Sequence, residues 1–332
     1  MSTIFDVAKK SGVSIVTVSR LLNNPGIVSK RTAEKIYMVM DKLNYQPNQI
    51  ARSMVSKRTN TIGVIMPDIK NTFFNSWFRF IEDYAATQGF NLVLCNTDED
   101  PLKEIKYIKL LQSQRVDGII IAPNSVKSAD YLIKSGMRFI LFDRVSRKTK
   151  TNFITSNHYE GAFKATEYLI GKGHRKIAVL KGPGILYPDI ERYSGFENAM
   201  KKHSIEIKKP FVLNCEFKED KAYAAALELL SKKEKPTAVF PFNSLMTIGV
   251  IKAVQKLKLK MPGNISLLSF DEIPGHEIFL PKITHVIQPI EMLGKEVITA
   301  LVEMIKNPGS KKRTRIVLKP ELVIGGSCKT LK

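Results

Sequence analysis

Residues 3–29, TIFDVAKKSGVSIVTVSRLLNNPGIVS, contain two short helical patterns separated by a glycine. Thr3 is expected to cap the first helix, because its hydroxyl and the acid three residues later satisfy free backbone amides. That helix is expected to end at Gly12, since glycine takes a left-handed C-terminal turn at little cost. Ser14 then predicts the start of a second helix, which stops at the Asn-Asn-Pro-Gly stretch of residues 23–26.

A third helix is expected after Ser29, and apolar residues recur at helical spacing in all three segments. These apolar residues are Val7, Ala8, Val13, Val18, Leu21, Leu22, Ala33, Ile36, Met40 and Leu43. Three short helices with a glycine in the turn between the first two are typical of a helix-turn-helix unit. Such a unit is expected over residues 1–46. Any small helical bundle is the alternative interpretation.

The second predicted helix begins with two β-branched apolar residues, Ile15 and Val16. Helical spacing turns both away from the stripe that Val13 and Val18 form, so we expect them on the surface. In a DNA major groove such side chains can pack against the C5-methyl of thymine, while Arg20 can donate to guanine O6 and N7. The alternative is that Ile15 and Val16 turn inward and extend the helical core.

The charge of the chain is concentrated near its start. The 332 residues, enough for two or three domains, carry a formal net charge of +21. Residues 1–60 contain ten basic and three acidic residues, a net +7, and the other 272 residues carry +14. The first segment therefore has more than twice the charge density of the rest, which favours a polyanionic partner such as DNA. General solubility is the alternative explanation.

A polar segment follows at residues 47–59. Residues 48–54 can form one or two helical turns, but they have little apolar surface to bury, and so short a helix is not stable alone in water. We therefore expect either a linker or a segment that becomes helical on a partner. In the second case Arg52, Lys57 and Arg58 would contact phosphates.

From Thr61 onward, apolar strands alternate with amphipathic helices, which predicts parallel α/β structure. Strands are expected near 61–67, 90–95, 117–121, 138–143, 176–181, 211–214, 237–241 and 265–270. Helices are expected at 73–88, 102–114, 126–135, 159–171, 190–203, 219–232 and 245–258. Two similar arrays of this kind indicate two lobes with a cleft between them.

Polar and aromatic residues follow the predicted strands, where open α/β sheets bind their ligands. The candidates for effector binding are Phe73, Asp143, Arg144, Arg192, Asn243 and Asp271. An aromatic face together with carboxylate, amide and guanidinium groups suits a polyhydroxylated ligand. The alternatives are structural: Phe73 as a core residue and Asp271 as the cap of the next turn.

Enzyme and metal sites are not expected. The three cysteines are too few and too scattered for a disulfide framework or thiolate cluster, and the five histidines lack metal-ligand spacing. GGSCKT (325–330) and KGPG (181–184) lack the spacing of phosphate-binding loops. No apolar signal region or membrane-length run is present, so we expect a cytoplasmic protein without cofactor or metal. A solute-binding receptor and a two-lobed sugar-processing enzyme are the alternatives.

Motifs along nearly the whole chain resemble the lactose-repressor/galactose-repressor family of bacterial transcription regulators. They are residues 3–29, KLNYQPNQIARSM (42–54), TNTIGVIMPDIKNTFF (59–74), DGIIIAP (117–123), LFDR (141–144), GHRKIAVLKG (173–182), RYSGF (192–196), KPTAVF (235–240) and SLLSFDE (266–272). The resemblance implies an all-α helix-turn-helix headpiece and an α/β effector domain of two lobes with parallel sheets, like periplasmic binding proteins.

The resemblance also implies how the headpiece meets DNA. The second helix is expected in the major groove, with Ile15 and Val16 at base edges, and residues 47–59 as a hinge in the minor groove. Met54 occupies the hinge position where the family usually has a leucine that wedges between base pairs. The expected DNA-binding residues are Thr3, Ser14, Ile15, Val16, Thr17, Ser19, Arg20, Asn23, Ala51, Arg52 and Met54.

The resemblance further implies that residues 60–332 form the effector domain. Lobe one is expected at about 60–158 and 290–320, and lobe two at about 159–289 and 321–332. We expect a homodimer, with residues 290–306 and the lobe surfaces as its interface, that binds a near-palindromic double-stranded DNA operator. It would act as a repressor controlled by a sugar-like small molecule. Control by a nucleobase or a protein co-effector is the alternative.

Three positions depart from the family pattern. Ser156-Asn157 stands where the family commonly has Asp-Asn after its fifth strand, and Asn243-Ser244 stands where it has Asn-Asp. Gly325 replaces a usual arginine. Each change removes a charge near the expected cleft or lobe crossings, which leaves the identity of the effector open.

Overall fold

The computed structural model describes residues 2–23, 25–46, 58–145, 151–310 and 313–331. The chain divides into two compact units, Met1–Thr59 and Asn60–Lys332. Most of the predicted hinge, including Ala51, Arg52 and Met54, lies outside the described residues.

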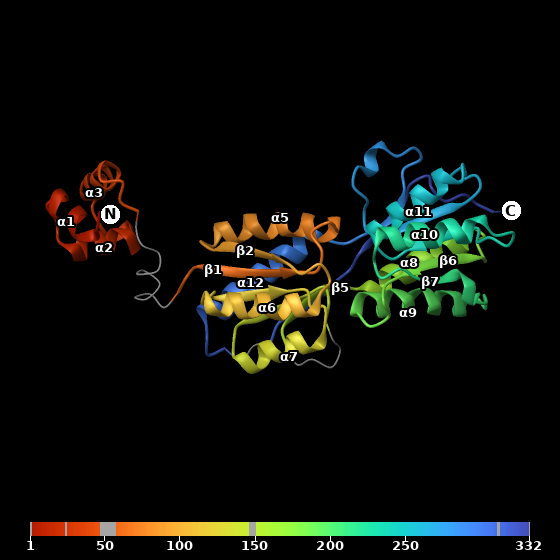
Figure 1. Ribbon diagram of the computed structural model, residues 1–332, viewed down its shortest axis with the longest axis horizontal. Coiled ribbons are helices and arrows are strands. Elements are labelled where there is room, and N and C mark those ends of the chain that lie inside the picture. The colour runs from red at the N-terminus through yellow and green to blue at the C-terminus, as the bar shows by residue number, and fades with distance from the viewer. Residues whose placement is uncertain (1, 24, 47–57, 146–150, 311–312, 332) are drawn as a thin grey trace. The chain divides into compact units, whose positions relative to one another are not determined.

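The first unit is the helical headpiece, drawn in red in Figure 1. It consists of α1 (Ile4–Ser11), α2 (Ile15–Asn23), the 3-10 turn η1 (Pro25–Ile27) and α3 (Lys30–Lys42). Thr3 and Asp6 form a reciprocal capping box, and Gly12 ends α1 with φ +65°. The backbone N–H of Thr17 donates to Ser14 Oγ over 3.1 Å. The three predicted helices and the caps on Thr3, Gly12 and Ser14 are thus confirmed.

The headpiece has its own small apolar core, because each helix turns one stripe inward. The buried residues are Val7, Ala8, Val18, Leu21, Ile36 and Met40. The other four predicted core residues, Val13, Leu22, Ala33 and Leu43, are partly buried against this cluster.

The second unit contains two six-stranded sheets (Figure 1). Lobe one is built from β1 (Thr61–Met66), α5 (Thr72–Thr87), β2 (Asn91–Asn96), α6 (Pro101–Ser113), β3 (Gly118–Ile121), α7 (Val126–Ser135), β4 (Phe139–Phe142), β5 (Phe153–Ser156), α12 (Ile290–Lys306) and β11 (Arg315–Leu318). The strand order in its sheet is β11-β5-β4-β3-β1-β2, and every pairing is parallel.

Lobe two is built from α8 (His158–Gly171), β6 (Ile177–Lys181), α9 (Tyr187–Lys202), η2 (Lys209–Phe211), β7 (Val212–Asn214), α10 (Glu219–Ser231), β8 (Ala238–Pro241), α11 (Ser244–Lys256), β9 (Ser266–Phe270), η3 (His276–Ile278), β10 (Thr284–Ile287) and β12 (Glu321–Val323). Its strand order is β12-β10-β9-β8-β6-β7. Only the pairing of β10 with β12 is antiparallel among the pairings described in this lobe.

The long elements of both lobes lie within a few residues of their predicted positions, except α12, over whose residues no helix was predicted. Four short strands, β5, β10, β11 and β12, were not predicted from the residue pattern. Each has only three or four residues, but β3, β4, β7 and β8 are equally short and were predicted, so length alone does not account for the difference.

The chain passes between the two sheets after β5, after β10 and after β11. The second passage returns α12 to lobe one, where its apolar side chains join the core formed with α5. Met292, on the other face of α12, is 53% exposed, so the expectation that residues 290–306 supply the dimer interface stays a prediction that concerns this face alone. Leu293, Val297, Ile298 and Leu301 are fully buried within one chain, and a side chain buried there is not free for a second subunit.

Candidate functional site

The exposed tip of α2 is the candidate DNA-reading surface. Ile15 is 38% exposed and Val16 is 57% exposed, whereas Val18 on the inward stripe is fully buried. The alternative in which Ile15 and Val16 extend the headpiece core therefore does not fit. Arg20, one turn further along α2, is also exposed. The surface offers methyl groups and a bidentate donor side by side, which is the chemistry that reads thymine and guanine in the major groove.

Polar residues surround this tip. Ser14 Oγ and Thr17 Oγ1 lie 2.9 Å apart, and Thr3 caps the neighbouring α1. Ser14 and Thr3 are exposed, and Thr17 and Ser19 are half-buried. Ala51, Arg52 and Met54 lie outside the described residues, as does the side chain of Asn23. Contact of any of these residues with DNA stays a prediction.

The second candidate site lies between the lobes of Asn60–Lys332. All six predicted effector residues line one small cavity of about 20 Å³. They come from the start of α5 (Phe73), the end of β4 (Asp143 and Arg144), α9 (Arg192), the N-cap of α11 (Asn243) and the end of β9 (Asp271). Since about 10–15 Å³ is enough to hold one water, this cavity has room for about one water and not for a sugar, and the side chains occupy most of the site.

Arg192 is the centre of the site. Its Nη1 lies 3.8 Å from Asp271 Oδ2 and also donates to the backbone carbonyl of Phe242. The guanidinium carbon lies 3.8 Å from the ring centre of Phe270, a stacked cation–π arrangement. Burial raises the pKa of Asp271 and lowers the pKa of Arg192, because each charge has lost most of its water.

Asp143 and Asp271 occupy equivalent places in the two lobes. Each directly follows a central strand, β4 or β9, and each has a left-handed backbone, with φ +56° and +69°. Non-glycine residues rarely adopt this conformation, and it concentrates at functional sites because the surrounding structure must hold it. The two carboxylates are thus presented to the cleft by the same local turn.

Arg144 is engaged within lobe one. Its Nη1 and Nη2 donate to the two carboxylate oxygens of Glu99, each over 2.6 Å, and Nη1 also donates to Asn124 Oδ1. This bidentate pair leaves Arg144 as part of the cavity wall, held by protein groups. The guanidinium of Arg192 is likewise engaged, by the Phe242 carbonyl, Asp271 and His158, so direct contact of either arginine with an effector stays a prediction.

Phe73 combines its two predicted roles. Its ring stacks on Phe142 at a centroid distance of 5.8 Å, and Phe142 stacks on Trp77 at 3.8 Å. Phe73 is buried in the core of lobe one and also lines the cavity. It thus presents an aromatic surface to the site from a rigid support.

The sequence patterns missed several residues at the site. Phe217 lines the cavity with φ +59°, and Asn243 Nδ2 donates to its carbonyl over 3.1 Å. Phe217 comes three residues after β7, so the rule of looking beyond strand ends would have found it if applied to that strand. No pattern pointed to His158, which contacts both Asp143 and Arg192.

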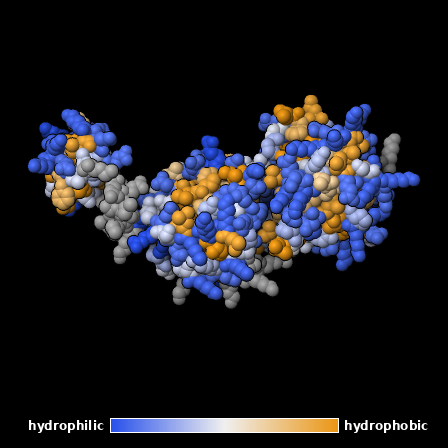
Figure 2. Space-filling view, viewed as in Figure 1, coloured by the Kyte–Doolittle hydropathy of each residue, from blue (hydrophilic) through white to orange (hydrophobic). Residues whose placement is uncertain are grey.

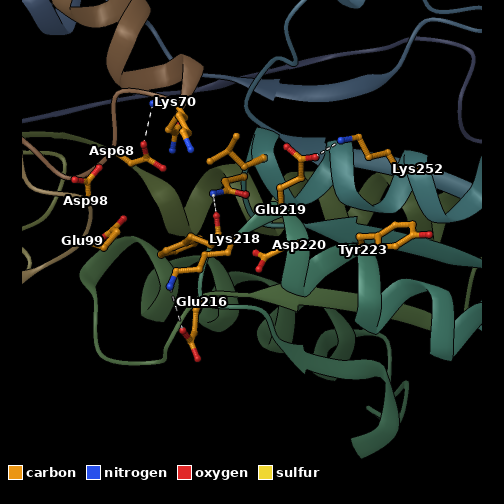
Figure 3. A pocket seen from close by; sticks show the side chains of 14 residues that line it. Asp68, Lys70, Asp98, Glu99, Glu216, Lys218, Glu219, Asp220, Tyr223 and Lys252 are labelled. Carbon is orange, nitrogen blue, oxygen red and sulfur yellow. Dashed lines mark hydrogen bonds and ion pairs between the residues drawn. The ribbon is translucent and has the colours of Figure 1, made fainter.

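A groove of about 720 Å³ adjoins the cavity and shares Asn71, Phe217 and Asn243 with it (Figure 3). Its other lining residues are Asp68, Lys70, Asp98, Glu99, Glu216, Lys218, Glu219, Asp220, Tyr223, Leu245 and Lys252. Six are acidic and three are lysines, which gives the groove a net formal charge of −3. Such a lining disfavours anionic ligands.

The three departures from the family pattern have structural consequences. Ser244 Oγ lies 3.0 Å from Thr72 Oγ1, a hydroxyl contact between the lobes. Ser156 Oγ is buried with no hydrogen-bond partner among the described residues. At Gly325 an added Cβ would lie 2.3 Å from the carbonyl oxygen of Lys282, so no larger residue fits without a backbone shift.

Neither a metal centre nor a reactive thiol is seen in the described part of the chain. Those residues include no group of three or more His, Cys, Asp or Glu side chains that could hold a metal ion. Burial raises the pKa of both Cys95 and Cys215 to about 11, so both thiols stay protonated. No helix within the described ranges is long and apolar enough to cross a membrane.

Sequence comparisons match both units to one family. Residues 3–48 match the family described as bacterial regulatory proteins, lacI family, and residues 59–322 match periplasmic binding proteins and sugar binding domain of LacI family. The HTH-type transcriptional repressor PurR of Vibrio vulnificus (strain CMCP6) is 36% identical over 334 residues, which cover all of both chains. It is named as a transcriptional repressor, not as an enzyme.

Solved structures agree with this match. A LacI family transcriptional regulator from Enterococcus faecium with bound ribose is 29% identical, with a TM-score of 0.74, over 82% of this chain and 100% of that one. The lac repressor dimer bound to operator and the anti-inducer ONPF has a TM-score of 0.87 over 99% of each chain. At 24% identity, this second likeness concerns the fold alone.

Proposed function

Given that the chain belongs to the lacI family of bacterial regulatory proteins and is a DNA-binding transcriptional repressor with an effector-binding domain, we propose that its effector is an uncharged sugar or sugar derivative. The effector would bind between the lobes in the groove of about 720 Å³ and would reach Arg192, Asp143 and Asp271 in the adjoining cavity, whose side chains would have to part to admit it. The observation that carries this proposal is the convergence on that cavity of six side chains from five elements of both lobes.

The chemistry of the site supports a polyhydroxylated ligand. Two carboxylates accept hydrogen bonds, Arg192 donates in a fixed plane, and Asn243 has both a donor and an acceptor. Phe73 and Phe217 supply apolar surface for the face of a sugar ring. Sugar phosphates and sugar acids fit poorly, because the adjoining groove is net negative and Arg192 already faces Asp271. The related regulator from Enterococcus faecium is described with bound ribose, which agrees with this class.

A nucleobase is the second candidate. Phe73, Phe74 and Phe217 all line the cavity, and three aromatic rings around one space can sandwich a planar heterocycle. Asp271 and Arg192 would then bond to the ring edges. A sugar and a nucleobase are both uncharged, so the electrostatic argument does not separate them.

On DNA, we propose that two headpieces read two half-sites of a near-palindrome, since a two-fold dimer reads two-fold DNA. The dimer surface is proposed around η3, where Ile278 is 82% exposed and Leu280 is 91% exposed. Figure 2 shows hydrophobic surface over this loop of lobe two. Ile15 and Val16 would lie over thymines, and Arg20 over a G·C pair.

A thermal-shift screen tests the effector class. D-ribose, cellobiose, adenine and ribose 5-phosphate would be added to the full chain and to Arg192→Ala. An uncharged compound should raise the melting temperature of the wild type but not of the variant, because ligand binding stabilises only the state that binds it. A shift by ribose 5-phosphate alone would contradict the proposal.

Sedimentation at micromolar concentration should give a mass of two chains, and a mass near four would refute the dimer.

A further inference from the structure

His158 is a buried histidine at the point where the chain first passes from lobe one to lobe two. It is the first residue of α8, one residue after the N-cap Asn157. Its ring lies 6.0 Å from the ring of Tyr187 and 6.0 Å from that of Phe270. The side chain of His158 is fully buried.

The two ring nitrogens face groups of opposite sign. Nε2 lies 3.0 Å from Asp143 Oδ1, and Nδ1 lies 3.2 Å from Arg192 Nη2 and 3.4 Å from Arg192 Nε. Because a guanidinium only donates hydrogen bonds, Nδ1 must accept and therefore carries no proton. The neutral ring then has its proton on Nε2, which faces the Asp143 carboxylate at 3.0 Å without the alignment of a hydrogen bond. Thr155 Oγ1, 3.3 Å away, donates to the Asp143 carbonyl and so also faces Nε2 as an acceptor.

Through this ring a carboxylate of lobe one is tied to a guanidinium of lobe two, and both line the cavity. We propose that His158, neutral and protonated on Nε2, is a positioning residue that holds Arg192 and Asp143 in place for the effector, and that effector binding weakens when the ring takes a second proton. This inference rests on the proposed effector site, which it deepens by adding a residue and a response to pH.

The response to pH follows from what surrounds the ring. A proton on Nδ1 would point at the N–H groups of Arg192, so two donors and two positive charges would face each other. Arg192 would have to leave its position over Phe270. The other charged or titratable groups around the ring are Asp143 after β4, Asp271 after β9 and Tyr187 at the start of α9. Burial lowers the pKa of His158, and the positive charge of Arg192 lowers it further, whereas Asp143 and Asp271 act in the opposite direction. Effector binding is therefore expected to weaken on the acid side of the ordinary histidine range.

The protonation state of His158 and the position of Arg192 can both be measured without any effector. The full chain, labelled with ¹⁵N at histidine and arginine, has five histidines, and the His158 signals are those missing in His158→Gln. We expect an unprotonated Nδ1 and a protonated Nε2 at neutral pH. The Arg192 Nε–H signal should shift in His158→Leu and stay close to wild type in His158→Gln, whose amide keeps one acceptor and one donor. A proton on Nδ1, or an Arg192 signal unmoved by His158→Leu, would overturn the inference.

Calorimetry with D-ribose and adenine, between about pH 5 and 8, tests the effect on binding. For a probe that binds, the wild type should lose affinity by about tenfold at the acid end, or about 1.4 kcal/mol. His158→Gln should bind within about threefold of wild type at pH 7.5 and lose the pH dependence, and His158→Leu should bind about tenfold more weakly throughout. His203→Gln, at an exposed histidine 2.7 Å from Glu167, is the matched control and should keep the wild-type profile.

The outcomes separate the two proposals. If neither probe binds the wild type, the proposed effector class fails, and the spectra of His158 and Arg192 still decide the positioning role. If a probe binds and His158→Gln retains the wild-type pH profile, the inference fails while the effector site stands.

Discussion

Arg192→Ala is expected to separate the stabilising role of the buried ion pair from its role in binding. The substitution removes the partner of Asp271, the stacking on Phe270 and the donor to the Phe242 carbonyl. Removing one member of a buried pair costs about 3–5 kcal/mol, because the remaining charge is left without compensation. Since burial already raises the pKa of Asp271, that carboxyl can take up a proton, and Gln288 still donates to it over 2.5 Å. We therefore expect the low end, a loss of about 3 kcal/mol in the free energy of unfolding.

Asp271→Asn supplies the second half of the test. In the double variant Arg192→Ala/Asp271→Asn no charge is stranded, so about 1–2 kcal/mol of the lost stability should return. Effector affinity should not return, because both groups proposed to bond the ligand have changed. Recovery of stability without recovery of binding is the signature expected of residues that contact the ligand.

Urea unfolding of the full chain and calorimetry with the compound that emerges from the screen measure the two quantities. The single variant should bind about 100-fold more weakly, as expected when one or two hydrogen bonds from a charged donor are lost. Arg79→Ala is the matched control, because Arg79 pairs with Asp83 at 3.6 Å on the exposed face of α5 and should cost no more than about 0.5 kcal/mol. Unchanged effector affinity in Arg192→Ala would move the site elsewhere. A double variant no more stable than the single one would refute the energetic coupling.

Changing Ile15 and Val16 to a polar pair should redirect base preference at two adjacent positions, with headpiece stability altered by less than about 0.5 kcal/mol, since both are exposed. Selection from random DNA that returns the same site for both proteins would contradict this. Operator affinity should fall with salt at a slope of log K against log salt of roughly −7, if about four phosphates are neutralised per half-site, and a slope shallower than about −3 would leave the basic headpiece only a solubilising role. Burial lowers the pKa of His158 and His174, so the unfolded chain binds more protons as the pH falls through about 6.5. Stability should therefore drop by about 1–2 kcal/mol between pH 7.5 and 5.5 in urea titrations, and by less in His158→Gln. Gly325→Ala should destabilise by about 1–3 kcal/mol, because the new Cβ meets a backbone carbonyl, and an unchanged urea midpoint would show that the loop yields freely.

Much of the headpiece could be predicted because its signals are local. The capping groups of Thr3 and Ser14 and the left-handed turn at Gly12 each act within three or four residues. The exposure of Ile15 and Val16 follows from helical periodicity alone. How the headpiece lies on DNA is not a local property, so the contacts of these residues with bases stay predictions.

The positions of the effector candidates were also predictable, but their roles were not. Parallel strands place their carboxyl ends along one edge of a sheet, so residues that follow strands gather there whatever the rest of the chain does. That rule brought Asp143, Arg192 and Asp271 to one cavity. It could not show that Arg144 is engaged by Glu99, a residue 45 positions earlier, or that α12 belongs to the core.

Caps, turns and periodicity are properties of neighbouring residues, so they were enough to predict the two units, the order of the long elements other than α12, and the strand ends and helix tip where functional groups lie. Which of these groups contact one another depends on tertiary packing. His158 gains its place between Asp143 and Arg192 because the chain passes from lobe one to lobe two at that residue and a helix from lobe two packs against it. Contacts across 15 and 34 residues depend on how both sheets and their helices pack together, and no local pattern encodes that packing.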